Sequence, residues 1–344
     1  MYSILELEKR VVDTGICTNC GACQGMCPYW KSWEGRTFVD YDCDRKEGRC
    51  KYFCPRMPAD LDELRDKLYG RDGCEIIPEI GPFRALYLTR AADPDIRKSS
   101  QHGGTMTALV ELALAEGFID AAVLSKAEGT LDPKGVLVTE PSKVRSCSGS
   151  SFQIPPTLAV LNEALAADEH KSIGVVGTPC KALAVAKMKA KPYADNDNHA
   201  DNIGMVFGLF CGWGLDWKGL AALGDADHVD ILPSKYHCME MDGREVDLDD
   251  VLPLVRNACK YCDDMTAEFA DLSVGGARSS DGWDVDKGWN QLIVRTEKAA
   301  QLVRIAREKG VLEFKDFGGE EAEAAALDKI IRASASKRAK ALHL

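Results

Sequence analysis

The chain has 344 residues, of which 45% are hydrophobic and 28% charged, and its formal net charge is −11. This composition is typical of a globular protein and not of a disordered one. The acidic balance argues against a nucleic-acid partner, because a general nucleic-acid binder needs a basic surface to displace counterions from phosphates. The length suits one large domain or two domains of unequal size.

The beginning of the chain shows no basic segment followed by an apolar core, so it predicts no signal peptide. The longest apolar stretch, residues 203–215, contains four glycines and is shorter than the roughly 20 residues that a membrane-spanning helix needs. We therefore expect a cytoplasmic protein with no direct membrane insertion. In the reducing cytosol its 14 cysteines are expected to be metal ligands or catalytic thiols and not disulfides.

Residues 1–75 contain eight cysteines and several prolines, with little helical or strand periodicity. A segment of this kind cannot bury enough apolar surface by itself, so bound metal would supply much of its folding free energy. We expect a small domain here that is held together by its ligands. A short helix is predicted at residues 60–68, and the linker after it ends near Gly81 and Pro82.

From residue 83 onward short apolar strands alternate with amphipathic helices, which is the pattern of an α/β domain. We assign residues 76–344 to this domain and expect a mainly parallel sheet. In chain order the predicted elements are a strand at 84–90, a helix at 105–116, a strand at 118–126, a helix at 156–167, a strand at 172–176, a helix at 181–189, strands at 203–210 and 291–295, and helices at 298–309 and 320–344.

Four cysteines near the start have the spacing that binds iron–sulfur clusters. Cys17, Cys20, Cys23 and Cys27 form the run C-x2-C-x2-C-x3-C, which Pro28 follows. Bacterial-type ferredoxins use this run to hold a [4Fe-4S] cluster with the first three thiolates, while the fourth crosses to a second cluster. A zinc site is the alternative, but zinc needs only four ligands and four more cysteines follow.

The next cysteines complete a second ferredoxin motif only in part. Cys50 and Cys54 have the expected spacing, but Glu47 stands where the motif would carry a cysteine. Cys74 either replaces the missing ligand or is a buried free thiol. The usual crossover gives one cluster with the ligands Cys17, Cys20, Cys23 and Cys54, and a second with Cys27, Cys43, Cys50 and, as the replacement, Cys74.

Two later cysteines each follow a predicted strand, Cys180 in GVVGTPC and Cys211 in GMVFGLFC. The carboxyl ends of parallel strands lie at one edge of a sheet, so these two thiols are expected to be close together. Cys259 and Cys262 form a C-x2-C pair that could complete a four-thiolate site with them. A single pair of this kind is a weak signal and also suits structural zinc.

Several segments of the large domain recur together in one known family. They are Ser100-Gln101-His102-Gly103-Gly104, EGFIDAAVLSK, GTPCKA, GLFC, CKYCDDMTAEFADLSVG and Ser280-Asp281-Gly282-Trp283, in this order between about residue 83 and residue 295. In these segments the chain resembles the coenzyme F420 hydrogenase/dehydrogenase beta-subunit family, whose members are flavin-containing iron–sulfur subunits. Some members also carry an N-terminal ferredoxin module, which would make residues 1–75 a ferredoxin-type [4Fe-4S] domain.

The resemblance implies a [4Fe-4S] cluster on the cysteines of the matching motifs, Cys180, Cys211, Cys259 and Cys262, and an FAD close to it. It also implies exchange of electrons with the deazaflavin coenzyme F420 or a similar soluble carrier. The partner would be a redox subunit, such as a hydrogenase, a formate dehydrogenase or a heterodisulfide-reductase-like complex. Nothing in the composition or spacing by itself reveals the FAD. No G-x-G-x-x-G sequence follows a predicted strand, so a Rossmann dinucleotide site is not supported.

Two donor-rich turns are the candidate walls of a flavin site. Gly103 and Gly104 would let the backbone approach a ligand, and the helix after them offers free N–H groups and the positive end of its dipole. The alternative is that both turns only start helices, with serine and threonine as caps. His102 stands where the family usually has Asp. The candidate cofactor-binding residues are Ser100, Gln101, His102, Gly103, Gly104, Thr105 and Thr107 in the first turn, and Ser148, Gly149, Ser150 and Ser151 in the second.

Together these features predict an electron-transfer oxidoreductase subunit. It would exchange a hydride between F420, or a similar carrier, and FAD, and it would pass single electrons to a partner through one cluster in the large domain and two in the N-terminal domain. No residue is predicted to act as a general acid or base. The alternatives are a flavin-free iron–sulfur shuttle, the same relay with ferredoxin or NAD(P)H in place of F420, and a zinc-stapled interaction module.

Overall fold

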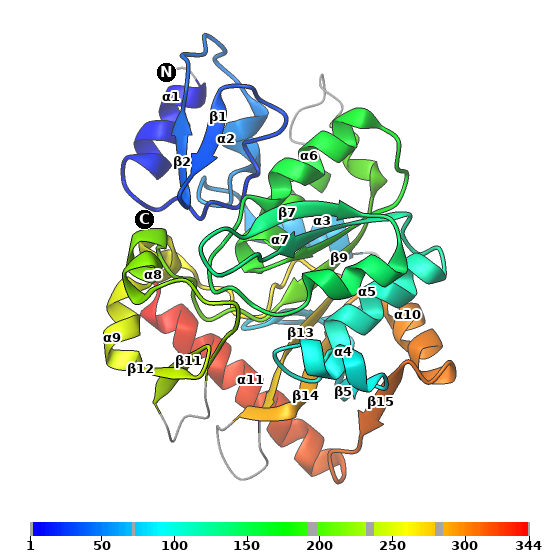
Figure 1. Ribbon diagram of the computed structural model, residues 1–344. Helices are drawn as coiled ribbons and strands as arrows, with labels where there is room; N and C mark the ends of the chain where they lie inside the picture. The colour runs from blue at the N-terminus through cyan, green and yellow to red at the C-terminus, as the bar shows by residue number, and fades with distance from the viewer. Residues whose placement is uncertain (1–2, 71–72, 191–197, 232–236, 279–284, 343–344) are drawn as a thin grey trace.

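The computed structural model describes residues 3–70, 73–190, 198–231, 237–278 and 285–342. A mixed sheet of eight strands forms its centre, in the order β15-β5-β14-β13-β9-β8-β6-β7 (Figure 1). The strands are β5 (Ala85–Ala91), β6 (Ala121–Lys126), β7 (Lys134–Val138), β8 (Ile173–Gly177), β9 (Ile203–Leu209), β13 (Leu272–Arg278), β14 (Val285–Val294) and β15 (Leu312–Lys315).

Five of these eight strands, β5, β13, β9, β8 and β6, run in one direction, and β15, β14 and β7 run in the other. The predicted α/β class with a mainly parallel sheet is therefore confirmed. The edge strands β15 and β7 were not predicted, whereas the strand predicted at 291–295 forms the end of β14, which runs antiparallel to its neighbours β5 and β13. β15 (LEFK) contains two charged residues and β7 (KGVLV) begins with Lys and Gly, so neither shows the uncharged apolar run by which the equally short β8 was predicted.

Helices cover both faces of the sheet (Figure 1). Successive residues of β9 show the division, because Val206 packs into the core beneath one set of helices while Met205 and Phe207 pack into the core beneath the other. The first set is α6 (Thr157–Ala167) and α7 (Pro179–Lys189), with α3 (Leu61–Tyr69) outside α7, and the second is α5 (Thr105–Ala115) and α10 (Glu297–Glu308).

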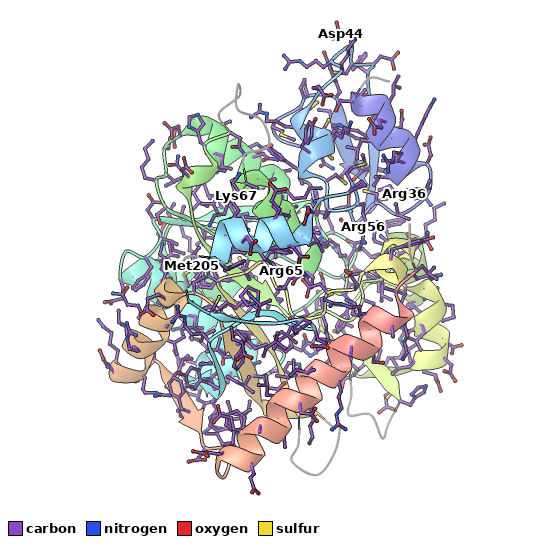
Figure 2. All side chains as sticks on the ribbon, turned by 180° about the vertical axis from the view of Figure 1, so that it is seen from behind. Arg36, Asp44, Arg56, Arg65, Lys67 and Met205 are labelled. Atoms are coloured by element: carbon purple, nitrogen blue, oxygen red, sulfur yellow. The ribbon has the colours of Figure 1, made fainter. Side chains whose placement is uncertain are left out.

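The long C-terminal helix α11 (Glu320–Lys340) crosses the same face as α7, where its Ile330 packs against Leu86 and Ile293 of the sheet (Figure 2). All predicted helices are present, with ends that differ by a few residues. Among the described residues, no helix combines the length and the apolar character that crossing a bilayer requires.

Short elements connect this framework. They are α4 (Pro94–Ser99), the 3-10 helices η2 (Pro141–Cys147), η3 (Ala200–Asn202), η5 (Leu252–Leu254) and η6 (Asn257–Tyr261), the helices α8 (Trp217–Leu223) and α9 (Leu248–Val251), the antiparallel pair β3 (Glu75–Ile77) and β4 (Gly81–Phe83), and the small antiparallel sheet of β10 (Val229–Ile231), β11 (Cys238–Met241) and β12 (Arg244–Asp247).

The N-terminal part stands beside the large sheet and has its own small core (Figure 1). It consists of α1 (Ser3–Leu7), the π-helical turn η1 (Glu8–Val12), the hairpin of β1 (Trp30–Trp33) and β2 (Arg36–Val39), and α2 (Arg49–Phe53). Ile4, Leu7 and Trp30 are among the fully buried side chains of this core. The sequence shows none of these elements, because segments of four or five residues contain little more than one period.

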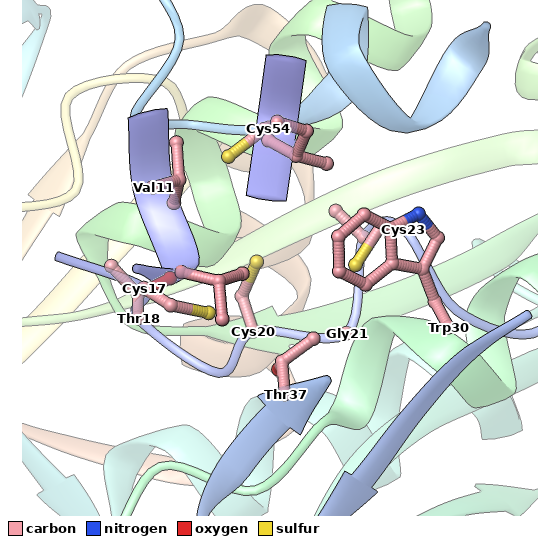
Figure 3. Close-up of a pocket in the computed structure, with 12 residues that line it drawn as sticks. Val11, Cys17, Thr18, Cys20, Gly21, Cys23, Trp30, Thr37 and Cys54 are labelled. Atoms are coloured by element: carbon pink, nitrogen blue, oxygen red, sulfur yellow. The ribbon is translucent and has the colours of Figure 1, made fainter. Parts of the chain in front are cut away.

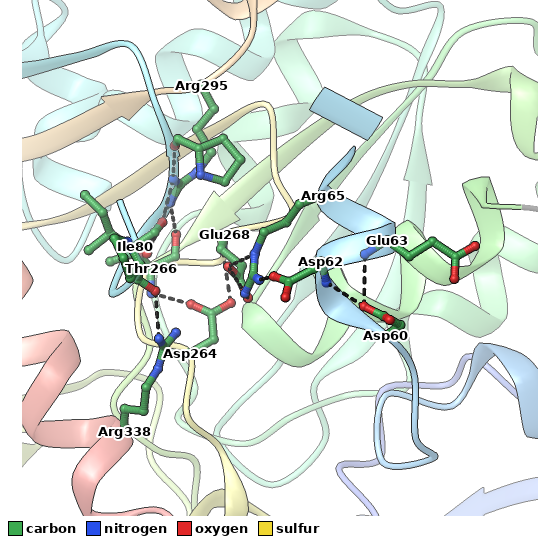
Figure 4. Close-up of polar contacts among 12 residues, drawn as sticks. Asp60, Asp62, Glu63, Arg65, Ile80, Asp264, Thr266, Glu268, Arg295 and Arg338 are labelled. Carbon is green, nitrogen blue, oxygen red and sulfur yellow. Dashed lines mark hydrogen bonds and ion pairs between the residues drawn. The ribbon is translucent and has the colours of Figure 1, made fainter. Parts of the chain in front are cut away.

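A buried arginine fastens the linker between the two parts to the large sheet. Arg295, directly after β14, is fully buried, and its guanidinium donates to the carbonyl oxygens of Ile80 at 2.7 Å and Thr266 at 3.0 Å (Figure 4). Nearby, Arg65 of α3 donates to both carboxylate oxygens of Glu268, at 3.1 and 3.2 Å. Residues of the linker and of α3 thus converge on one loop, residues 264–268.

We expect Arg295→Met to lower the free energy of unfolding by about 3 kcal/mol, because several buried carbonyl groups would lose their donor at once. Chemical denaturation of the purified protein measures this loss. Arg304→Met is the matched control, since Arg304 is 60% exposed and pairs with Glu297 only on the surface. Equal stability of the two variants would contradict the role of Arg295.

Candidate iron–sulfur and flavin site

Four cysteines of the N-terminal part surround one space. Cys17, Cys20, Cys23 and Cys54 line a single cavity together with apolar side chains such as Val11, and Figure 3 shows their sulfurs pointing toward a common centre. Burial, with the neighbouring thiol of Cys180, raises the pKa of Cys20 to about 12, and burial raises that of Cys54 to about 11. Thiols of this kind ionise only when a bound metal replaces their protons.

Two glycines let the first cysteine loop lie against α6. Gly21 and Gly25 have φ values of +87° and +76°, and a Cβ on them would come within 2.5 Å of the Pro156 oxygen and 2.2 Å of the Ala159 oxygen, respectively. The loop is fastened there by hydrogen bonds, since the N–H of Leu158 donates to the carbonyl of Cys20 at 3.0 Å. The N-terminal cysteine run is therefore packed directly on the large domain.

The remaining N-terminal cysteines divide into two places. Cys27, Cys43 and Cys50 pack in the small N-terminal core, and Cys27 is one of the groups that raise the pKa of Cys50, after burial. Cys74 packs instead against the core of the large domain, where Tyr69 and Arg295 are its neighbours. The structure thus brings Cys27 close to Cys50, places Cys43 against the same small core, and places Cys74 in another core.

The four cysteines of the second group converge from three separate segments. Cys180 starts α7 directly after β8, Cys211 follows β9, and Cys259 and Cys262 lie in and just after η6. Burial raises the pKa of Cys211 far above its usual value, and Cys259, Cys180 and Cys262 are the thiols close enough to add to this effect. The expectation that the ends of the parallel strands β8 and β9 bring these thiols together is in agreement with this arrangement.

The spacing of the sulfurs bears on the choice of metal. Four thiolates around one zinc ion, with Zn–S bonds of about 2.3 Å, lie about 3.8 Å from one another. All 14 cysteines are among the described residues, and no three of their sulfurs lie within 4.8 Å of one another. In both groups the sulfurs are therefore farther apart than the four thiolates of a zinc site.

The two groups adjoin each other. Cys180 is close enough to Cys20 to raise its pKa, and Pro55 and Arg56 line a cavity together with Cys180 and Cys262. Arginines also cross between the groups, since Arg56 donates to the carbonyl of Tyr261 at 2.7 Å, inside the C-x2-C pair. In the opposite direction, Arg256 donates to the carbonyl of Cys17 at 3.1 Å.

Three lysines approach the cysteine segments from the interior. Lys187 of α7 donates to the carbonyl oxygens of Cys54 and Met57 at 2.7 and 2.9 Å, and Lys181 donates to the hydroxyl of Thr157 at 2.7 Å. Burial lowers the pKa of each of these two lysines to about 8, although nearby thiols oppose the shift.

The third lysine, Lys337 of α11, donates to the carbonyl oxygens of Cys211 and Asp264 at 2.8 and 2.7 Å. Sequence reasoning missed all three lysines, because lysines are common on exposed helix faces and nothing in the sequence distinguishes buried ones.

The glycine turn predicted to bind flavin lies at the same edge of the sheet. Gly103 follows α4, and its carbonyl accepts a hydrogen bond from the N–H of Ala91 at the carboxyl end of β5 at 2.8 Å. Gly104 has a φ of +78°, and a Cβ there would meet Ile96 Cγ2 at 2.9 Å. Protein packing therefore requires this glycine whether or not a ligand approaches it.

Several donors of this turn are engaged within the protein. Gln101 donates to Asp230 of β10 at 3.1 Å, and the hydroxyl groups of Thr105 and Thr89 share a hydrogen bond of 2.9 Å. The N–H of Thr105 donates to Asn290 Oδ1 at 3.2 Å. The backbone N–H groups of Met106 and Thr107 also lie in the first turn of α5, where N–H groups have no acceptor within the helix. Ser100 and His102 are half-buried, and Thr107 is buried.

The second predicted turn, Ser148–Ser151, lies beside the chain that follows Cys211. The carbonyl of Phe152 accepts a hydrogen bond from Leu215 N–H at 2.8 Å, and its ring lies 5.7 Å from that of Trp213. Gly149 has a φ of +97°, and a Cβ added at that position would meet no other group within 4 Å. Ser150 is exposed, whereas the hydroxyl groups of Ser148 and Ser151 donate to nearby carbonyls.

Comparison with known proteins identifies the family of the large domain. Residues 86–162 match the family model described as "Coenzyme F420 hydrogenase/dehydrogenase, beta subunit N-term", and residues 170–319 match the model of the corresponding C terminus. These matches cover well over half of the chain. The chain belongs to this family. It is therefore an oxidoreductase subunit by class, as the sequence motifs predicted.

Individual relatives agree with this assignment. The coenzyme F420 hydrogenase subunit beta of Methanococcus voltae is 28% identical over 69% of this chain and 86% of its own length. A subunit of the F(420)H(2) dehydrogenase of Methanosarcina mazei is 25% identical over 87% of this chain and 85% of its own. A chain of the F420-reducing [NiFe] hydrogenase complex from Methanosarcina barkeri has the same fold, with a TM-score of 0.67 and 24% identity over 77% of this chain and 93% of that one.

At the two ends of the chain the family models leave residues 1–85, with eight cysteines, and residues 320–344, with the whole of α11, unmatched. Both parts contact the second cysteine group, through Arg56 and Lys337. Of the family motifs, Ser280-Asp281-Gly282-Trp283 lies outside the described residues.

Replacing one ligand of the second group tests the grouping. We expect Cys211→Ser to contain about four iron and four sulfide atoms fewer per chain than the unchanged protein, as one [4Fe-4S] cluster would require. Cys147→Ser is the matched control, because Cys147 is half-buried at the end of η2 and has no cysteine at a ligand spacing. Iron and sulfide analysis after anaerobic purification measures both. An unchanged content in Cys211→Ser would contradict the assignment.

Proposed function

We propose that this chain exchanges a hydride between coenzyme F420, or a similar carrier, and a bound FAD, and passes the electrons singly through [4Fe-4S] clusters to a partner oxidoreductase. The observation that carries the proposal is that the carboxyl ends of β5, β8 and β9 place three features along one edge of the sheet. These are the glycine turn before α5, the second cysteine group, and the first cysteine group that adjoins it through Cys20 and Cys180.

The proposal assigns residues 1–75 to a ferredoxin-type domain with two clusters and residues 76–344 to the FAD and [4Fe-4S] domain. The crossover pattern of Cys17, Cys20, Cys23 and Cys54 supports the first cluster, since these four line one cavity. Cys27, Cys43 and Cys50 are the proposed ligands of the second. The proposed ligands of the third are Cys180, Cys211, Cys259 and Cys262.

The chain's own residues supply what such clusters need. A cluster with four thiolates is a buried anion, and hydrogen bonds to its sulfurs and nearby charge tune its potential. Two backbone groups already point at ligand sulfurs, since Asn19 N–H lies 3.4 Å from Cys17 Sγ and Gly214 N–H lies 3.3 Å from Cys259 Sγ. Lys187 adds a donor beside the Cys54 segment, and Lys337 adds one beside the Cys211 segment.

For the FAD, the open first turn of α5 and the uncrowded Gly149 turn are the surfaces that fit a phosphate and a ring system. A bound flavin accepts a hydride, that is two electrons and one proton, and returns the electrons one at a time to one-electron centres. The residues of the two turns would orient it. The proposed contacts remain Ser100, Gln101, His102, Gly103, Gly104, Thr105 and Thr107 and residues 148–151. The side chain of Gln101 binds Asp230 and that of Thr105 binds Thr89, so these two would position the turn and not touch the flavin themselves.

The names of the relatives support the carrier and the kind of partner. Similar chains include an F420 hydrogenase subunit, an F420H2 dehydrogenase subunit, an F420-dependent formate dehydrogenase subunit and an F420-dependent sulfite reductase. We propose F420 as the carrier, a redox subunit as the partner and the cytoplasm as the location. A flavin-free shuttle is the alternative, and it is favoured only if the purified protein holds clusters but no flavin.

Rapid mixing with reduced F420 tests the carrier. The protein is purified with its cofactors and mixed with reduced F420 under anaerobic conditions. We expect the visible absorbance of the flavin to decrease as the flavin is reduced. Reduced nicotinamide and reduced ferredoxin are the comparison donors. Bleaching by one of these but not by reduced F420 would overturn the choice of carrier, and a protein that contains no flavin would overturn the mechanism.

The iron content also tests the N-terminal assignment. We expect about twelve irons per chain for three clusters of four irons each. Cys74→Ser should keep all of them, because Cys74 packs in the core of the large domain beside Tyr69 and not with Cys27, Cys43 and Cys50. Cys27→Ser is the comparison and should lose about four irons. Loss of the same amount from Cys74→Ser would restore Cys74 as the replacement ligand.

A further inference from the structure

The C-terminal helix α11 reaches the second cysteine group although it begins where the family match ends. The C-terminal family model stops at residue 319, and α11 extends over the 21 residues Glu320–Lys340. Ile330 and Ser334 bury one side of the helix, at 3% and 0% exposure. Its far end then comes to the C-x2-C pair, where the N–H of Leu342 donates to the carbonyl of Lys260 at 2.8 Å.

Two side chains in the last turns of α11 hold it against the loops of the cluster site. Arg338 donates to the carbonyl of Pro78 at 2.7 Å, within the linker that Arg295 fastens. Lys337 bridges two loops, because its ammonium donates to the carbonyl of Cys211 at 2.8 Å and to that of Asp264 at 2.7 Å. The Lys337 ammonium thus connects the loop of Cys211 to the loop that directly follows Cys262.

The same ammonium is placed to act on the thiol sulfurs. The Asp264 carbonyl that it binds lies 3.3 Å from Cys262 Sγ. Both partners of Lys337 are carbonyl oxygens, which only accept hydrogen bonds, and lysine is ordinarily an ammonium at neutral pH. A positive charge therefore lies beside the segments of two of the four proposed ligands.

We infer that Lys337 is the charge partner of the cluster on Cys180, Cys211, Cys259 and Cys262, and that through it the C-terminal helix sets the reduction potential of this cluster. The inference rests on the proposed function. Reduction adds one electron, and so one negative charge, to an already anionic cluster–thiolate unit, without breaking a bond. A fixed cation nearby stabilises the reduced form more than the oxidised form and raises the potential.

Three variants separate charge from packing. Lys337→Met removes the charge and keeps much of the length, Lys337→Arg keeps the charge, and Lys340→Met removes an exposed lysine three residues further along the same helix. Each full-length protein would be titrated anaerobically with dithionite while electron paramagnetic resonance follows reduction. The signal that is missing from Cys211→Ser identifies the cluster in question.

We expect Lys337→Met to make this cluster harder to reduce, with an oxidised-to-reduced ratio about tenfold higher at a given potential, which is a downward shift of about 59 mV for a one-electron couple. Lys337→Arg should recover most of the shift, and Lys340→Met should leave the potential unchanged. Loss of four irons from Lys337→Met but not from Lys337→Arg would be a stronger form of the same dependence on charge and would support the inference.

An unchanged potential in Lys337→Met with a full iron content would overturn the inference. So would iron loss from Lys337→Met and Lys337→Arg alike, because packing and not charge would then be the requirement. These outcomes differ from failure of the proposed function, in which the unchanged protein itself would contain no iron and sulfide. Activity with a carrier is not needed for any of these readouts.

Discussion

Hydrogen bonds from long cationic side chains to backbone carbonyl groups hold the cysteine segments in place, and the arrangement of both sites depends on them. Lys187 binds the carbonyl of Cys54, Arg256 binds that of Cys17, and Lys337 binds that of Cys211. Each of these cations comes from a different part of the chain from the cysteine that it holds. Such a contact has two effects. It fixes the position of the cysteine segment, and it adds a positive charge beside that segment. This is how a protein with a net charge of −11 can surround its buried thiols with cations.

The topology of the sheet explains why the groups meet where they do. Because β5, β8 and β9 run in the same direction, the glycine turn before α5, Cys180 and Cys211 all fall at one edge. Crevices at the carboxyl ends of parallel strands are the common place for ligands in α/β folds. The antiparallel strand β14 within the sheet does not disturb this arrangement. It brings Asn290 to the start of α5, where the amide side chain binds the N–H of Thr105, and it places Arg295 beneath the linker.

The N-terminal part is built into this site rather than attached by a free tether. Gly21 and Gly25 allow the cysteine run to lie on α6, Arg56 reaches into the C-x2-C pair, and Arg65 pairs with Glu268. The two cysteine groups adjoin each other at this interface, where Cys180 lies close enough to Cys20 to raise its pKa. The C-terminal helix closes the opposite side through Lys337. The four cysteines of the second group thus lie in the part of the chain that matches the family, whereas the N-terminal part and α11, which surround them, lie outside that match.

The sequence alone determined the elements and residues that follow local rules. The long strands and helices, the α/β class, the C-x2-C-x2-C-x3-C run and the family motifs could all be recognised, because periodicity and ligand spacing are properties of neighbouring residues. The tertiary structure decided what depends on contacts between distant residues. It separated Cys74 from Cys27, Cys43 and Cys50, satisfied the hydroxyl of Thr105 with Thr89, and brought Lys181, Lys187 and Lys337 to the thiols. A lysine on a helix is the same letter whether it faces water or a buried carbonyl, and only the packing of the other elements distinguishes the two.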